Sequence, residues 1–239
     1  MAYIEKRWRF HHAVEVEQYH SARYGAPGEK RQPRRRPTPE QIERQNQKNR
    51  EKKCRRKLRM YFDINDYFVT LTYRRDARPP DMAAAKADFA KFLRKLRKGY
   101  KEQGQPMLWI RNIEVGSRGA WHVHLVIKRI PDADLLIRQA WPHGRVTHQL
   151  LYERGEFREL AAYMVKTPRT DPRLIEAHYS TARGMPVPEP RPRRIRWKTW
   201  RQIRIPQGYY LDKDSLQEGT NPVTGHAYRS YTLLRYRRE

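Results

Sequence analysis

The chain of 239 residues has one cysteine, Cys54, and no long apolar run. A single cysteine excludes an internal disulfide and a zinc site built from several cysteines. No stretch reaches the about 18 apolar residues needed to span a bilayer, and the N-terminus lacks the apolar segment of a signal peptide. Cys54 lies in the basic run KKCRRK, where an unreactive thiol on a basic helix is favoured over a reactive thiolate. We therefore expect a cytoplasmic protein of a reducing compartment, with no membrane partner.

Acidic residues are also scarce. The chain has 52 Lys and Arg against 26 Asp and Glu, which gives a net charge of +26. Self-repulsion at this charge opposes compaction unless a polyanion neutralises it, and nucleic acid is the obvious polyanion. Lys and Arg within 30–59 and 191–204 are expected to contact phosphates. Trp197 and Trp200 would either stack on bases or pack in a core.

The chain falls into three predicted parts. Residues 1–59 form a basic N-terminal arm and helix; the helix begins at Pro39 with Thr38 as its cap and is expected to be long and exposed. Residues 60–170 alternate strands with helices. Residues 171–239 form a basic and aromatic C-terminal extension, whose segments are either strands or docking segments.

The middle part predicts an α+β fold, a central antiparallel sheet flanked by helices. Hydrophobic residues recur there at strand or helix spacing. The expected order is a strand, a helix, a hairpin, a helix, a strand and a helix, at residues 67–73, 82–103, 107–115 with 121–127, 132–140, 144–151 and 156–166.

Two histidines in the second hairpin strand are the clearest candidate ligands. His122 and His124 alternate with Val123, so both imidazoles project from one face of a strand. Imidazole binds manganese-like and later transition metals. Glu114 on the neighbouring strand is placed to complete a three-ligand site. The alternatives are a histidine pair that binds phosphate or a hydrogen-bonded core pair.

Tyr163 and Lys166 are the candidate nucleophile and its accessory cation. They stand three residues apart in AAYMVK, on one face of the predicted helix. A neighbouring ammonium group lowers the free energy of ionising a phenol, or stabilises charge on a phosphate. A half-buried structural tyrosine is the alternative. Thr70 and Thr72 share a face of the first strand, where they contact either DNA or each other's neighbours across the sheet.

The motifs FVTLTY, WHVHLVI and YMVK, in this order, resemble the HUH endonuclease superfamily, in particular the single-tyrosine replication initiators of rolling-circle plasmids and phages of bacteria. The resemblance covers roughly residues 60–170. Upstream, RYGAPGEKR, RPTPEQIERQNQKNREKK and FDINDYFVTLTY are similar to one branch of such initiators from bacterial mobile elements. Family members carry the two histidines at the centre of a sheet and the tyrosine on a helix that faces them.

This resemblance implies a metal-dependent nicking and strand-joining enzyme. His122 and His124 would hold a divalent metal, Mn²⁺ or Mg²⁺, with Glu114 as third ligand, a position that differs among branches. Tyr163 would form a covalent 5′-phosphotyrosine with single-stranded or origin hairpin DNA and leave a 3′-hydroxyl for synthesis. The implied partners are a host polymerase and helicase. The chain has no Walker-type loop of its own, so we expect no fused helicase.

Two other functions stay open at this point. An HUH transposase or relaxase would use the same chemistry. Relaxases carry paired tyrosines, however, and the transposases usually lack a lysine three residues after the tyrosine, so YMVK favours replication. A non-catalytic nucleic-acid-binding protein would explain the charge but would leave His122, His124 and Tyr163 as coincidence.

Overall fold

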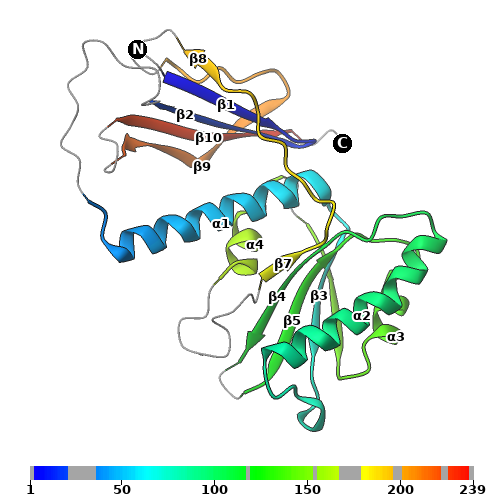
Figure 1. Cartoon of the computed structure of the whole chain (residues 1–239). Helices are drawn as coiled ribbons and strands as arrows, with labels where there is room; N and C mark the ends of the chain where they lie inside the picture. The colour runs from blue at the N-terminus through cyan, green and yellow to red at the C-terminus, as the bar shows by residue number, and fades with distance from the viewer. Residues whose placement is uncertain are drawn as a thin grey trace. The chain divides into compact units, whose positions relative to one another are not determined.

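The computed structural model describes residues 3–20, 36–116, 119–152, 155–166, 179–195, 201–221 and 226–236. The chain divides into two compact units. Residues 47–186 form the central unit, and residues 1–46 with 187–239 form the terminal unit. Each unit is built on its own five-stranded antiparallel sheet (Figure 1).

The central unit confirms the predicted α+β class and the predicted order of its elements. Its sheet has the strand order β6-β3-β5-β4-β7. The β-branched and aromatic residues of YFVTLT and WHVHLVI suit these inner strands, which are buried on at least one face. The strands are β3 (Tyr67–Thr72), β4 (Trp109–Val115), β5 (Trp121–Ile127), β6 (Val146–Leu150) and β7 (Tyr179–Thr181).

One face of this sheet packs on α2 (Met82–Glu102) and α3 (Ala133–Ala140) (Figure 1). The Asp81 carboxylate caps α2 by accepting a hydrogen bond from the Ala84 amide at 2.8 Å. Between β3 and α2 lies a short 3-10 helix, Arg75–Ala77. The core on this face is formed by alternate strand residues and the apolar stripes of the two helices, among them Val69, Leu71, Val123, Leu125, Phe92, Leu96 and Ile137.

The other face of the sheet is covered over only part of its length. The C-terminal half of α1 (Pro39–Tyr61) and α4 (Arg158–Met164) pack against the end of the sheet that carries Phe68, Val126 and Ile110. Further along the same strands the outward residues become polar. An apolar floor under two helices therefore gives way to a row of polar side chains on the same face.

The expectation of an exposed α1 is wrong for its C-terminal half. Thr38 does begin the helix, because its Oγ1 accepts from the Gln41 amide while the Gln41 side chain accepts from the Thr38 amide. Cys54 and Leu58, however, are fully buried against the sheet. These two residues, four apart on one face of the helix, are a short apolar stripe in a strongly basic sequence.

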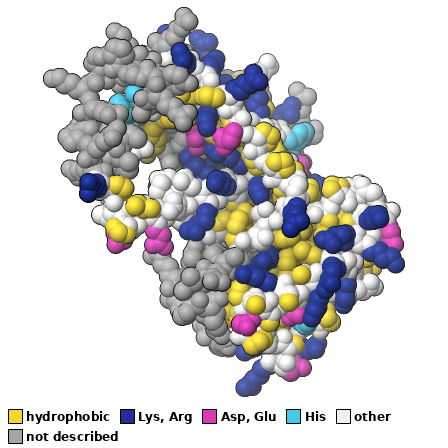
Figure 2. Space-filling view, in the orientation of Figure 1, with side chains coloured by type: hydrophobic (Ala, Val, Ile, Leu, Met, Phe, Trp, Pro, Cys, Tyr) yellow, Lys and Arg dark blue, Asp and Glu magenta, His cyan; other side chains and the backbone are white. Residues whose placement is uncertain are grey.

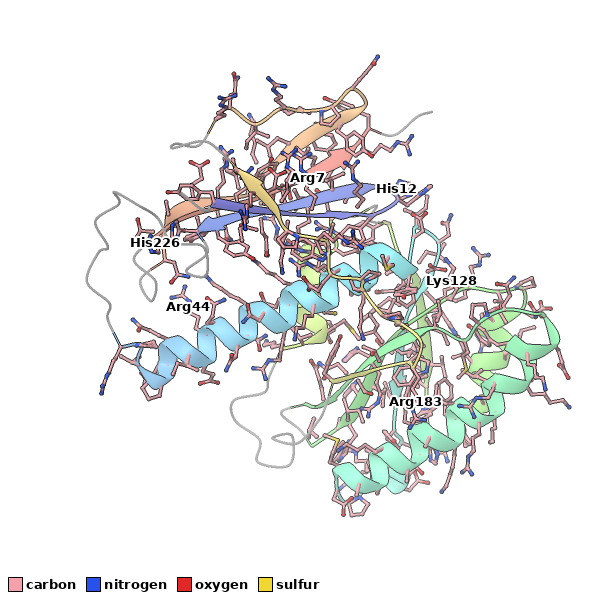
Figure 3. All side chains as sticks on the ribbon, turned by 45° about the horizontal axis from the view of Figure 1, so that its top comes forward. Arg7, His12, Arg44, Lys128, Arg183 and His226 are labelled. Atoms are coloured by element: carbon pink, nitrogen blue, oxygen red, sulfur yellow. The ribbon has the colours of Figure 1, made fainter. Side chains whose placement is uncertain are left out.

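Asp66 fixes the start of β3 relative to the end of β5. Its buried carboxylate accepts from Lys128 Nζ at 3.0 Å and from the Arg129 amide at 2.9 Å. Lys128, labelled in Figure 3, follows the last residue of β5. This tie and the backbone ladder hold β3 and β5 in a single register, which aligns the polar residues of both strands.

The terminal unit joins strands from both ends of the chain. Its sheet has the order β8-β1-β2-β10-β9, with β10 between β2 and β9. The sequence analysis found little periodicity in residues 1–26 and left the C-terminal segments undecided between strands and docking segments, whereas the structure pairs the two ends. The strands are β1 (Tyr3–Arg9), β2 (Ala13–His20), β8 (Arg193–Ile195), β9 (Tyr209–Thr220) and β10 (Ala227–Arg235).

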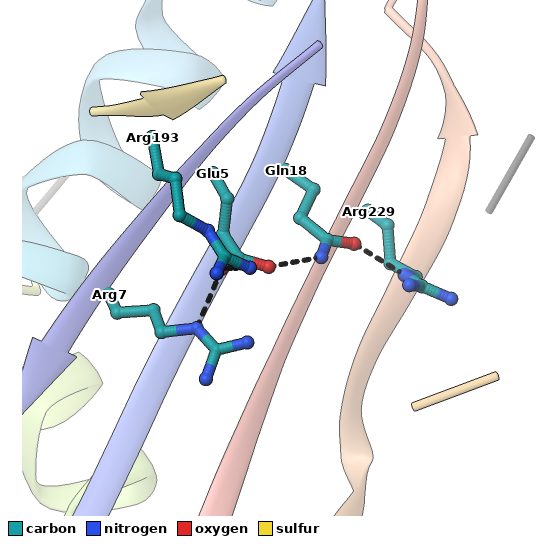
Figure 4. A network of polar contacts seen from close by, with 5 residues as sticks. All are labelled: Glu5, Arg7, Gln18, Arg193 and Arg229. Atoms are coloured by element: carbon teal, nitrogen blue, oxygen red, sulfur yellow. Dashed lines mark hydrogen bonds and ion pairs between the residues drawn. The ribbon is translucent and has the colours of Figure 1, made fainter. Parts of the chain in front are cut away.

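A buried carboxylate organises one face of the terminal sheet (Figure 4). Glu5 accepts hydrogen bonds from Arg7 at 2.7 Å, Gln18 at 2.6 Å and Arg193 at 3.0 Å. Gln18 in turn accepts from Arg229 at 2.8 Å. Burial alone would raise the pKa of Glu5, but the hydrogen bonds from Arg7 and Gln18, together with the nearby arginine charges, hold that pKa below its ordinary value.

Lys and Arg side chains are spread over the visible faces of both units (Figure 2). This distribution agrees with the basic composition of the sequence. None of the helices in the described part of the chain has the length and apolar character required to cross a membrane.

Candidate active site

His122 and His124 project from the polar part of the open face of the central sheet, as the alternation predicted. On β3, Thr72 lies opposite His122 and Thr70 lies opposite His124. Thr70 Oγ1 is 3.3 Å from His124 Nδ1. This contact occupies one ring nitrogen of His124 and directs the other, Nε2, away from β3.

Glu114 occupies the position on β4 directly across from His122. Its carboxylate nevertheless leans toward His124, with Oε2 at 3.3 Å from Nε2 of that ring. Asn112, the residue opposite His124, donates from Nδ2 to Glu114 Oε1 at 3.3 Å. The sequence analysis did not single out Asn112. Its place two residues before Glu114, on the same face of β4, was the available signal.

Tyr163 reaches this cluster from α4. Its hydroxyl lies 2.8 Å from His124 Nε2 and 3.4 Å from Glu114 Oε2. The apolar neighbours Ala161 and Met164 are buried and anchor the helix to the sheet. The Tyr163 ring meets Phe68 edge to face, with centroids 6.1 Å apart. The structure therefore brings Tyr163, His124 and Glu114 together from a helix and two strands.

The electrostatics of the cluster favour a carboxylate and a neutral phenol. Burial alone would raise the pKa of Glu114, but contacts with His124 and Tyr163 outweigh it and hold the pKa below its ordinary value. The positive charge of Lys166 acts in the same direction. Burial, and then the negative charge of Glu114, raise the pKa of Tyr163. The hydroxyl thus holds its proton next to an acceptor.

Lys166 lies beyond the end of the helix that the sequence predicted for it. The last residue of α4 is Met164, and the Lys166 amide donates to the Tyr163 carbonyl at 3.2 Å in the turn that follows. The exposed Lys166 side chain influences the pKa of Glu114, whereas the causes of the Tyr163 shift do not include it. Its electrostatic influence therefore falls on the carboxylate.

The residue types of the cluster suit a divalent ion. Imidazole and carboxylate are both ligands of manganese-like metals, and the His124 Nε2 and Glu114 Oε2 donors already converge. The His122 ring stands parallel to that of His124, with centroids 6.1 Å apart. As the side chains lie, no group of three or more His, Cys, Asp or Glu among the described residues is arranged to hold a metal. A three-ligand site would need His122 to turn toward the other two donors.

Burial lowers the pKa of His122, and His124 and Arg78 add to this effect against the opposing charge of Glu114. A neutral imidazole is the form that binds metal. Trp197 and Trp200, the predicted stacking residues, lie outside the described residues.

The comparisons with known proteins bear on the central unit alone. Neither the curated proteins nor the solved structures yielded a match. The matching segment reported next runs from the start of β3 past the end of α4 and covers less than half of the chain. Residues 66–168, which include Glu114, His122, His124 and Tyr163, match the model of a family described as Replication-associated protein ORF2.

Proposed function

We propose that the protein nicks single-stranded DNA at a replication origin and starts rolling-circle replication, with Tyr163 as the nucleophile. One observation carries the proposal: the Tyr163 hydroxyl lies 2.8 Å from His124 Nε2 and 3.4 Å from Glu114 Oε2. The match of residues 66–168 to a replication-associated family supports the biological setting.

His122, His124 and Glu114 are the residues that would hold a divalent ion, Mn²⁺ or Mg²⁺. Such an ion supplies Lewis acidity to a non-bridging oxygen of the scissile phosphate. Thr70 keeps His124 Nε2 directed toward Tyr163. Asn112 steadies the Glu114 carboxylate through Oε1 and leaves Oε2 for the site.

The chain's own groups account for the transfer itself. The Tyr163 oxygen bonds to phosphorus as the bond from phosphorus to the 3′ oxygen breaks, which leaves a 5′-phosphotyrosine and a 3′-hydroxyl. Glu114 and His124 are both within reach to accept the tyrosine proton. The ester retains the energy of the broken bond, so the reverse reaction rejoins the strand.

The basic surface provides the complementary partner for DNA. A net charge of +26 attracts a polyanion and makes binding depend strongly on salt. The released 3′-hydroxyl would be extended by a host polymerase behind a host helicase.

The decisive experiment is a search for the covalent adduct. A pool of random single-stranded oligonucleotides labelled at the 3′ end is incubated with protein and Mn²⁺ and then run on a denaturing gel. A 5′-phosphotyrosine leaves the labelled 3′ fragment on the protein, so the label should migrate with it. Binding without an adduct in any divalent ion would instead indicate a non-catalytic DNA-binding protein.

A further inference from the structure

A cavity of about 420 Å³ opens beside Tyr163, between α4 and the edge strand β6. Its size lies within the range of about 300–1,000 Å³ that is usual for small-ligand sites. The cavity is lined by Phe68, Gln149, Leu150, Leu151, Tyr152, Phe157, Glu159, Leu160 and Tyr163.

The lining combines flat apolar walls with a few polar groups. Phe68 and Tyr163 form an aromatic corner, with their rings edge to face. Leu150 is 49% exposed and Tyr152 is 76% exposed, so apolar surface here is left to solvent. Gln149 and Glu159, also exposed, supply an amide and a carboxylate at the rim.

Two residues link the cavity to the candidate active site. Tyr163 belongs to both. Phe68, the second shared wall, stacks on His124 with an interplanar angle of 10° and centroids 5.8 Å apart. A group seated in the cavity therefore touches the residues that face the scissile phosphate. In a nucleic acid, the group that is covalently joined to that phosphate through one sugar is a base.

We propose that this cavity takes one nucleobase of the bound DNA strand and prefers a base with an exocyclic amino group, adenine or cytosine. This inference rests on the proposed nicking function and names a subsite for its substrate. Aromatic and apolar walls suit the flat face of a base. The Glu159 carboxylate accepts hydrogen bonds only, and the Gln149 amide both accepts and donates, which matches an amino group next to a ring nitrogen.

Occupancy of the cavity can be tested by filling it. Leu150→Trp places a large side chain at the rim, and Leu135→Trp on α3 is the matched control because Leu135 is 50% exposed and does not line the cavity. Binding of oligo(dA), oligo(dC) and oligo(dT) of equal length is measured by fluorescence anisotropy without divalent ions, so that no strand is cut. The wild-type protein should bind oligo(dA) and oligo(dC) about 5-fold or more tightly than oligo(dT), the lower end of what one seated base contributes.

The Leu150→Trp protein should lose this preference, and the Leu135→Trp protein should keep it. Gln149→Leu should also lessen it, while Gln139→Leu, at an exposed glutamine of α3, should not. Equal binding of the three oligonucleotides by the wild-type protein, or an unchanged preference in Leu150→Trp, would overturn the base pocket. Failure of the proposed nicking would look different: the base preference would be present, but no covalent adduct would form with Mn²⁺.

Discussion

The hydroxyl of Tyr163 lies 2.8 Å from Nε2 of His124, a contact that joins the last helix of the central unit to the middle strand of its sheet. Tyr163→Phe removes this hydroxyl and keeps the ring that packs on Phe68. The variant should form no covalent DNA adduct, while its thermal unfolding and DNA affinity stay close to wild type. Mass spectrometry of the wild-type adduct should find the nucleotide on the peptide that contains Tyr163. A modified peptide without this residue would show that another tyrosine is the nucleophile.

His122→Ala and His124→Ala should each weaken Mn²⁺ binding and abolish the adduct. Each variant removes one imidazole from the face that also carries Glu114. His148→Ala is the control, because His148 pairs with Val69 on β3 and so belongs to the opposite face of the sheet. Titration calorimetry with Mn²⁺ measures the effect. Equal metal affinity in all of these proteins would remove the metal site from the proposal.

Gly144→Ala should destabilise the central unit. A Cβ at Gly144 would stand 2.2 Å from the Thr72 carbonyl oxygen, which is backbone and belongs to the strand of the candidate site. Relieving such a clash costs roughly 1–3 kcal/mol of the free energy of unfolding. Gly116→Ala is the control, since its new Cβ would meet nothing closer than 3.6 Å. Urea denaturation followed by circular dichroism should show a lower midpoint for Gly144→Ala only.

Glu5→Gln should destabilise the terminal unit in a pH-dependent way. Glu5 is 2% exposed, and losing its charge should cost roughly 1.5–3 kcal/mol, the contribution of a hydrogen bond to a charged group. Because its folded pKa is lowered, its stabilisation is complete above the ordinary glutamate pKa and is lost as pH falls through the folded pKa. The difference in unfolding free energy between wild type and variant should therefore shrink in acid.

The control for Glu5 is Glu189→Gln. Glu189 pairs with Lys6 at 3.1 Å on the surface, and its side chain is 64% exposed. Exposed pairs of this kind contribute about 0–1 kcal/mol. A loss as large in the control as in Glu5→Gln would mean that burial of the Glu5 carboxylate is not the cause.

The thiol of Cys54 should not react with alkylating reagents in the folded protein. Cys54 is fully buried against the sheet, and burial raises the pKa of its thiol to about 12. At pH 8 almost none of it is thiolate, and none is accessible. Labelling with iodoacetamide, followed by mass spectrometry, should become fast only in denaturant. Rapid labelling under native conditions would show that this half of α1 detaches from the sheet.

The central unit was predictable from sequence because its signals are local. Alternation in WHVHLVI puts His122 and His124 on one face whatever the rest of the chain does. The apolar spacing of residues 82–103 likewise indicates a helix without further context. Both features depend on neighbours within a few residues.

What the sequence did not predict depends on register and on distant pairing. The contact of Thr70 with His124 follows from the alignment of β3 with β5, which no local pattern specifies. Lys166 was expected on the helix, but α4 ends at Met164, two residues earlier. The predicted boundaries at residues 60 and 170 stay predictions about where an independently folding fragment begins and ends, and limited proteolysis can test them.

The pairing of β2 with β10 has a consequence for the order in which the protein is made. During synthesis β2 leaves the ribosome about two hundred residues before the strand that covers its edge. Until residues 227–235 emerge, β2 can pair with β1 on one side only, and its other edge carries open backbone hydrogen-bonding groups. A ribosome that stalls late in the message therefore releases a chain whose central unit is complete but whose first hairpin has an open edge for other strands.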